Sequence, residues 1–249
     1  MKSISIVIPA FNESDNFNQG VLTQVADYLK ENNLTWPVIV VDDGSTDGSN
    51  KNIKTWVEKQ PNWTFIQNSH QGKAATVKTG VFAVKTKYTL FTDFDQATPI
   101  GEVKKLIPFL GKGCQIVIGS REVQGSTREK EPALRHLMGK VFNFVVQLFA
   151  IRGIHDTQCG FKLFNTKVAK ELFNSLKIYQ PKNEKHAFTG AFDVELLFIA
   201  NKRKIKIAEV PITWHHASTT RVSPIRDSIR MFFDVLRIRL ADILGAYPK

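Results

Sequence analysis

Five short apolar runs, separated by stretches of helical periodicity, limit this chain to few folds. The runs are rich in β-branched and aromatic residues and lie at Ile4–Ile8, Val38–Val41, Thr64–Ile66, Tyr88–Phe91 and Gln115–Ile118. Apolar residues recur at helical spacing between them, which is typical of successive β-α-β units. Strands that are apolar throughout are usually buried on both faces, so the pattern predicts an α/β fold with a mostly parallel sheet between helices.

The length of 249 residues, with 43% of them hydrophobic, suits one α/β domain. Only Met1–Ser3 precedes the first apolar run, and that run is too short for a signal peptide or an anchoring helix. We therefore expect a cytoplasmic chain. The two cysteines, Cys114 and Cys159, have no metal-ligand spacing and are expected to be buried free thiols.

The formal net charge of +11 favours an anionic partner, such as nucleic acid, anionic lipid or a phosphorylated substrate. The sequence contains no zinc-finger spacing, no aromatic-basic ribonucleoprotein motif and no long lysine tract. We therefore expect no nucleic-acid partner, and the basic residues should act locally.

Polar residues follow three of the apolar runs directly. These segments are Pro9–Glu13, Asp42–Ser45 and Thr92–Asp95. In a parallel sheet, ligands bind beyond the carboxyl ends of the strands. The three segments are therefore predicted to line one binding site.

Two acidic motifs carry most of this prediction. Asp42 and Asp43 could hold a polar ligand, or they could be a solvated acidic pair in a capped turn. Asp93 and Asp95 occupy alternate positions after a strand, so both carboxylates can face one side and offer hard oxygen ligands to a divalent cation. A nucleotide diphosphate could complete the coordination, although a DxD string by itself is more often a solvated loop.

A family resemblance emerges from these motifs together. PAFNE, VDDGSTDGS, HQGKA and TDFDQATP resemble family 2 glycosyltransferases of the GT-A type, in order and in spacing. Farther on, IGSRE, RGIHDTQCGFKLF, AFDVELLFIA and EVPITW resemble the dolichyl-phosphate β-glucosyltransferases and, more distantly, the dolichyl-phosphate mannose synthases. The similarity covers about residues 4 to 240, and DTQCGFKLF is its most specific segment.

The resemblance implies a single GT-A domain with C-terminal amphipathic helices. Residues of about 1–120 would bind the nucleotide sugar, and about 121–249 would bind the acceptor and carry membrane-facing helices. The implied reaction is inverting transfer of a hexose, with UDP-glucose as the expected donor, onto a polyprenyl phosphate. Mg²⁺ or Mn²⁺ is the implied cofactor.

The resemblance also assigns donor-side roles to eight residues. Pro9, Asn12 and Glu13 would surround the base and ribose, Asp42 would contact the uracil or ribose with Asp43 beside it, Lys73 would lie near the nucleotide or diphosphate, and Asp93 and Asp95 would face the metal. Lys73 could instead be a solvated lysine at a helix start. Where mannose synthases carry a glutamine, this chain has Ala97, with Gln96 one place earlier, so the third protein ligand of the metal stays open.

The same resemblance assigns two arginines and one carboxylate to the acceptor side, and a third arginine to the diphosphate. Arg121 and Arg135 align with arginines that bind the acceptor phosphate, Arg221 matches a lysine near the diphosphate, and Asp193 lies where many family 2 enzymes carry a base. The arginines could instead be ordinary surface residues, and Asp193 could cap a helix. A phosphate acceptor is already anionic at neutral pH and needs no strong base, so Asp193 is expected to play a supporting role.

Two apolar stretches could bring the chain to a lipid. Residues 134–151 are strongly apolar but too short to span a bilayer comfortably, and a C-terminal stretch has apolar residues at helical spacing beside a stripe of arginines. We expect peripheral attachment to a membrane surface, with core packing or a dimer contact as the alternative. Two alternative functions remain: transfer to a hydroxyl acceptor with Asp193 as base, and an inactive membrane- or nucleic-acid-binding module.

Overall fold

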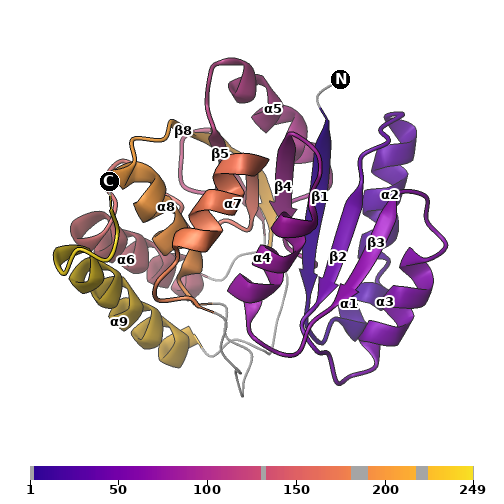
Figure 1. Ribbon diagram of the computed structural model, residues 1–249, viewed down its shortest axis with the longest axis horizontal. Coiled ribbons are helices and arrows are strands. Elements are labelled where there is room, and N and C mark those ends of the chain that lie inside the picture. Colours follow the sequence, from indigo (N-terminus) through magenta and orange to yellow (C-terminus); the bar gives the residue numbers. More distant parts are fainter. Residues whose placement is uncertain (1–2, 130–132, 181–189, 217–223, 249) are drawn as a thin grey trace.

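The computed structural model describes residues 3–129, 133–180, 190–216 and 224–248, with backbone alone at 133–137 and 224–228 (Figure 1). The strands are β1 (Ile4–Ala10), β2 (Val38–Asp42), β3 (Trp63–Gln67), β4 (Tyr88–Thr92), β5 (Ile116–Ser120), β6 (Thr127–Glu129), β7 (Phe161–Asn165), β8 (Ile207–Pro211) and β9 (Thr213–His215). The helices are α1 (Ser14–Asn18), α2 (Val21–Glu31), α3 (Ser49–Val57), α4 (Lys73–Ala83), the 3-10 helix η1 (Ile100–Glu102), α5 (Val103–Gly111), α6 (Ala133–Phe149), α7 (Thr166–Ser175), α8 (Phe192–Lys202) and α9 (Pro224–Ile243).

Seven strands form one twisted sheet in the order β3-β2-β1-β4-β7-β5-β8. All of its pairs are parallel except those of β7, which runs antiparallel to both β4 and β5. The predicted mostly parallel sheet is confirmed, and all five apolar runs lie in strands. Strand β7 was not predicted, and it places the start of a strand beside the carboxyl end of β4, where Thr92 pairs with Phe161.

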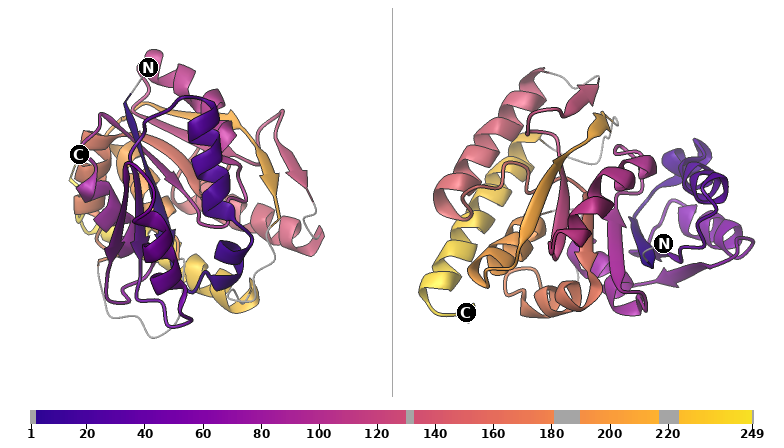
Figure 2. Two further views of the ribbon diagram at one scale, coloured as in Figure 1. Left: turned by 90° about the vertical axis from the view of Figure 1, so that its right-hand side faces the viewer. Right: turned by 90° about the horizontal axis from the view of Figure 1, so that it is seen from above.

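Helices cover both faces of the sheet, because successive strand residues point to opposite sides. Ile4, Ile6 and Ile8 of β1 belong to a core shared with α2, α3 and α5. Helix α4 packs on the other face against β1 and β2, where Gly80 lies against Val7 so closely that a side chain would overlap it. Helices α7 and α8 extend this second layer over β4 and β7 (Figure 2).

Helices α6 and α9 lie side by side at one end of the molecule (Figures 1 and 2). Their inner faces join the core through Phe142, Val146, Val235 and Ile238. Within the described ranges, neither these nor any other helices combine the length and apolarity that crossing a bilayer requires. The two cysteines are free and buried as expected, and burial raises the pKa of the Cys159 thiol to about 12.

A small parallel ribbon of β6 and β9 extends beyond the sheet. The backbone amide of His215 in β9 donates to the carbonyl of Ala97, 2.8 Å away. The ribbon is therefore tied directly to the turn that follows Asp93 and Asp95.

Candidate active site

The acidic pair after β2 is buried, which excludes the solvated pair that the sequence left open. Asp42 accepts hydrogen bonds from the amides of Gly44 and Ser45, each 3.0 Å away, and from the Ser45 hydroxyl at 2.5 Å. Asp43 accepts from the amides of Gln71 and Gly72, 3.0 and 2.9 Å away. Asp42 thus shapes its own turn, and Asp43 holds the loop that leads into α4.

His70 is a site residue that the sequence reasoning missed. Its Nδ1 lies 2.8 Å from the Asp43 carboxylate, and its ring stacks on Phe11 with centroids 4.1 Å apart. The stack joins the loops after β1 and β3, which are far apart in the sequence. The signal was present in the sequence, because His70 opens the HQGKA motif, but nothing there indicated its partners.

The loop after β1 is tied to the turn after β2. The amide of Asn12 donates to the Ser45 hydroxyl at 2.9 Å, and the amide of Thr46 donates to the Asn12 side-chain oxygen at 2.8 Å. Asn12 has a φ of 54°, a left-handed conformation that asparagine tolerates better than most residues. Glu13 is buried and its amide donates to the Ser49 hydroxyl. Asn12 and Glu13 are thereby tied to the segment that follows Asp42, and Pro9 lies opposite Val41 of β2.

Burial alternates along the Asp93-Phe94-Asp95 segment, which forms a turn after β4. Asp93 and Asp95 are partly exposed, whereas Phe94 and Gln96 are buried. The Lys73 ammonium lies 2.6 Å from Asp93 Oδ1. Burial lowers the pKa of Lys73, but the carboxylates of Asp93, Asp193 and Asp95 outweigh burial and raise it. Lys73 is therefore a charged partner of the turn, which excludes the solvated lysine.

The carboxylates of this turn fit a divalent cation that is shared with a ligand. Asp93 and Asp95 offer hard oxygen atoms, and both carboxylates lie within electrostatic range of the Lys73 ammonium. In the part of the chain that the structure describes, histidine, cysteine, aspartate and glutamate form no group of three or more that could hold an ion unaided. A cation here would thus need further ligands, and diphosphate oxygens suit this role. The side-chain Nε2 of Gln96 donates a hydrogen bond to the backbone carbonyl of Asp93, 2.8 Å away.

Asp193 forms a buried ion pair with a lysine that the sequence reasoning did not select. Lys162 Nζ lies 2.8 Å from Asp193 Oδ1 and also donates to the carbonyl of Cys159. Burial raises the pKa of Asp193, against the opposing effect of Lys162. The unpredicted strand β7 carries Lys162 beside Phe91 of β4. In the sequence, the only indication that Lys162 has a special role was its position inside the apolar run CGFKLF.

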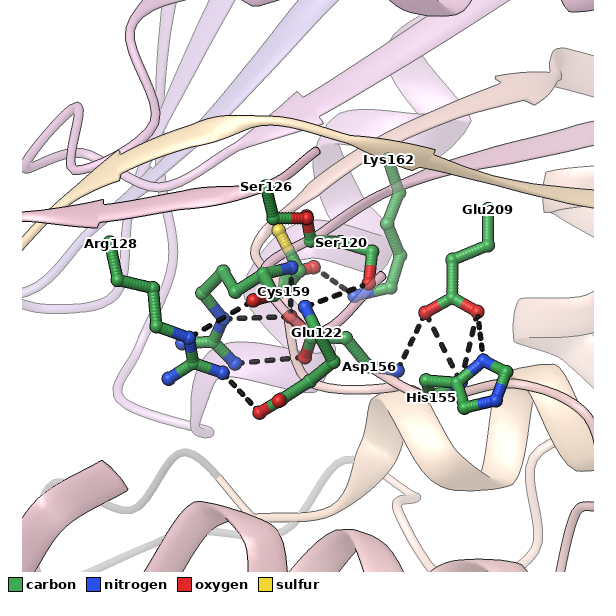
Figure 3. Close-up of polar contacts among 10 residues, drawn as sticks. Ser120, Glu122, Ser126, Arg128, His155, Asp156, Cys159, Lys162 and Glu209 are labelled. Carbon is green, nitrogen blue, oxygen red and sulfur yellow. Dashed lines mark hydrogen bonds and ion pairs between the residues drawn. The ribbon is translucent and has the colours of Figure 1, made fainter. Parts of the chain in front are cut away.

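Arg121, at the tip of β5, is paired rather than an ordinary surface arginine. Its Nε and Nη2 donate to the two carboxylate oxygens of Asp156 at 2.8 and 2.9 Å. Figure 3 shows the surrounding polar contacts of Asp156. Arg135 lies in the first turns of α6 as predicted, but its side chain is outside the description. Arg221 lies outside the described residues.

These groups converge on one edge of the sheet. The carboxyl ends of β1, β2, β4 and β5 meet there, together with the start of β7. Lys162 contributes to the pKa of both Asp156 and Asp193, so the Arg121 pair and the Asp193 pair lie within electrostatic range of each other. The edge offers carboxylates for a cation and cations for anionic ligands.

A protein-family model described as "Glycosyl transferase family 2" matches residues 5–173. The chain belongs to this family. The matched segment contains the acidic turns after β2 and β4, both basic partners Lys73 and Arg121, and the strand β7 with Lys162. The motif-based assignment is thereby confirmed.

Curated relatives of this family 2 glycosyltransferase share one name. A Dictyostelium discoideum protein named dolichyl-phosphate beta-glucosyltransferase is 33% identical over 98% of this chain and 76% of its own length. The Saccharomyces cerevisiae protein of the same name has the same identity and coverage, and the Homo sapiens protein is 32% identical over 99% of this chain and 78% of its own length.

Solved structures confirm the GT-A fold of this family 2 glycosyltransferase. Staphylococcus aureus TarS 1-349 with UDP-GlcNAc matches with a TM-score of 0.60 and 18% identity over 100% of this chain and 68% of that one. A Pyrobaculum calidifontis mannosyltransferase with GDP-Man and Mn²⁺ matches with a TM-score of 0.59 and 16% identity over 98% and 68%. At these identities the likeness concerns the fold alone.

Proposed function

We propose that this chain transfers glucose from UDP-glucose to a polyprenyl phosphate and inverts the anomeric configuration. The proposal rests on one observation: the carboxylates of Asp93 and Asp95 both lie within electrostatic range of Lys73 at one edge of the sheet. The alignment of nearly the whole chain with proteins named dolichyl-phosphate beta-glucosyltransferase supports it. Residues of about 1–120 would bind the donor and residues of about 121–249 the acceptor.

On the donor side, the proposed roles rest on the family resemblance and are supported by the contacts of the described side chains. Asp42 and Asp43 shape and join the loops that would surround the nucleoside, together with Pro9, Asn12 and Glu13. Asp93 and Asp95 would hold Mg²⁺ or Mn²⁺, which would stabilise the departing diphosphate when bound. Lys73, which contacts Asp93 here, would contact the diphosphate when the donor is bound. Arg221 is proposed as a further cation there.

On the acceptor side, Arg121 and Arg135 would bind the phosphate of the lipid. A phosphate oxygen attacks the anomeric carbon as its bond to the UDP oxygen breaks, so UDP leaves and an α-linked donor gives a β-linked product. The phosphate monoester is largely dianionic at neutral pH and needs no deprotonation. Asp193 is held by Lys162 and would stabilise the site rather than accept a proton.

A hydroxyl acceptor with Asp193 as base is the second candidate. One observation favours it, since burial raises the pKa of Asp193 toward the range of a base. The pairing with buried Lys162 works against it, because proton transfer to Asp193 would leave the lysine charge without its partner. An inactive module is disfavoured by the intact acidic turns.

The first test is a donor and acceptor panel. Purified chain is incubated with several nucleotide sugars, polyprenyl phosphate and Mn²⁺, and donor consumption and lipid product are measured. We expect UDP-glucose to be consumed only with polyprenyl phosphate, and a chelator to stop the reaction. Product formation from a hydroxyl acceptor, lost in Asp193→Ala but kept in Arg121→Ala, would replace this function by the second candidate.

Peripheral membrane attachment through α6 and α9 is part of the proposal. Large apolar side chains are exposed on both helices: Val141, Phe144, Leu148 and Phe149 on α6, and Ile229, Phe233, Leu240 and Ile243 on α9. Arg230, Arg237 and Arg239 are exposed on α9 as well. Apolar residues beside arginines suit the surface of an anionic bilayer. The cytoplasmic face of such a membrane is the expected location.

Substitution of the exposed aromatics tests this attachment. Phe144→Ser and Phe233→Ser should each weaken binding to vesicles of anionic lipid by roughly tenfold, from the apolar area that each ring would lose. Vesicle co-sedimentation measures the effect. Phe82→Ser is the matched control, because Phe82 is an exposed phenylalanine on α4, away from this face. Equal losses in all three variants, or none, would contradict the assignment of the face.

A further inference from the structure

Arg121 is held from several directions at once. The Asp156 carboxylate accepts from Nε, Nη2 and the backbone amide of Arg121, at 2.8, 2.9 and 2.9 Å. Arg128 Nε donates to the carbonyl of Arg121 at 3.1 Å, and the guanidinium carbon lies 5.3 Å from the centre of the Trp214 ring. These contacts come from the 155–160 loop, β6 and β9. One conformation of Arg121 is therefore strongly specified.

Asp156 is itself anchored by the sheet. Its amide donates to Glu209 Oε1 at 2.7 Å, and the amide of His155 donates to both Glu209 oxygens, at 3.1 and 2.9 Å (Figure 3). Glu209 lies on β8 beside Ile118 of β5, the strand that ends at Arg121. A chain of contacts thus runs from strand β8 through the 155–156 loop and back to the arginine.

Burial distinguishes the two partners of the pair. The side chain of Asp156 is 1% exposed, whereas that of Arg121 is 21% exposed. The carboxylate is therefore inside the protein, whereas part of the Arg121 side chain is open to solvent. A carboxylate that accepts two parallel hydrogen bonds from a guanidinium fixes its orientation. A supporting residue can in this way hold a phosphate-binding arginine in the orientation that binding requires.

Charge supports the same reading of the pair. Burial by itself would raise the pKa of Asp156, but the Arg121 guanidinium and the hydrogen bonds from Arg121 outweigh it and lower that pKa. A lowered pKa means that Asp156 stays ionised even somewhat below the ordinary aspartate pKa of about 4, and the ion pair is lost only when the pH falls through the lowered pKa. The pair therefore stays intact throughout the neutral range.

We propose that Asp156 is a positioning residue for acceptor binding: it presents Arg121 to the phosphate of the lipid, and Glu209 keeps Asp156 in place. The inference rests on the proposed function, in which Arg121 binds that phosphate. Asp156 itself does not touch the acceptor. Ordering Arg121 before the acceptor arrives removes an entropic cost that binding would otherwise carry.

Asp156→Asn tests the proposal, because asparagine keeps the shape but loses the charge and one acceptor oxygen. We expect KM for polyprenyl phosphate to rise by about 10- to 100-fold, the range for supporting partners of binding groups, with KM for UDP-glucose unchanged. Glu209→Gln should raise the same KM by a smaller factor. Glu58→Gln is the control, since Glu58 pairs with Lys54 on the surface beside α3 and should leave this KM unchanged.

A double-mutant cycle separates positioning from general stability. A lysine at position 121 cannot donate two parallel hydrogen bonds to the Asp156 carboxylate. Adding Asp156→Asn to Arg121→Lys should therefore raise the acceptor KM no further. Melting temperatures are measured for every variant, and Glu209→Gln carries the test if Asp156→Asn fails to fold. If the effects of Arg121→Lys and Asp156→Asn on the acceptor KM are additive, or if KM rises equally for both substrates, the positioning role of Asp156 is wrong. The proposed function would not be affected by that result. A wild-type chain that neither binds nor uses polyprenyl phosphate would overturn the proposed function, and this inference with it.

Discussion

Asp95→Ala is expected to lower kcat by about 10³-fold, the largest effect of any single substitution in this chain. Asp95 is partly exposed and, like Asp93, lies within electrostatic range of Lys73, so removing it would leave one carboxylate of the pair for the proposed cation. Removing one oxyanion-hole donor commonly lowers kcat by about 10²- to 10³-fold. We expect a loss of similar size when the charge on a departing diphosphate is no longer stabilised by the cation. Turnover at saturating UDP-glucose and Mn²⁺ measures the loss.

Two further measurements make this result specific to the cation. Calorimetric titration should show that Mn²⁺ strengthens UDP binding to the wild-type chain but not to Asp95→Ala. Asp27→Ala is the control, because Asp27 is an exposed aspartate on α2, outside the site, and its loss should leave turnover unchanged. Normal turnover by Asp95→Ala would remove the metal assignment, and with it the main support for the donor side.

The sheet and the donor side were largely predictable from local sequence. The composition of runs such as Ile4–Ile8 predicts buried strands. In a parallel sheet, the residues that follow each run lie at one edge. The placement of Asp93 and Asp95 on one side, expected from strand alternation, stays a prediction, because β4 ends at Thr92 and the next residues form a turn. Each inference needs only neighbouring residues and a general rule of sheet geometry.

The pairings between distant segments could not be predicted in this way. Arg121 and Asp156 are 35 positions apart, and Lys162 and Asp193 lie on β7 and α8. Strand β7 brings Lys162 to the site, and its antiparallel direction has no signal in a chain of otherwise parallel strands. Local patterns state which side chains are available, but the topology decides which of them meet.

His70 illustrates the same limit at shorter range. Lys73, three positions later in the same motif, was assigned through the family resemblance. The stacking of His70 on Phe11 and its contact with Asp43 depend on three loops from different strands. Knowing the motif was therefore insufficient to assign the histidine, whereas knowing the fold was sufficient.

Gly160→Ala is the second substitution with a large expected effect, and its cause is steric. A Cβ at position 160 would overlap the carboxylate of Asp93, so that side chain would have to leave its place beside Lys73. The backbone contact between the Asp93 amide and the Gly160 carbonyl, 3.1 Å long, leaves little room for the two segments to separate. We expect kcat to fall by about 100-fold through displacement of a metal-facing group, in the range known for misplaced catalytic groups.

The control for this substitution is Gly101→Ala, where a Cβ would make only ordinary contact with the Tyr28 ring and turnover should be unchanged. The apparent affinity for Mn²⁺ in the UDP titration should fall in Gly160→Ala and not in Gly101→Ala. If Gly160→Ala keeps full turnover and Mn²⁺ affinity, the orientation of Asp93 is not required for the reaction. Asp95 would then have to hold the cation without Asp93, and the function of the Lys73–Asp93 pair would be structural.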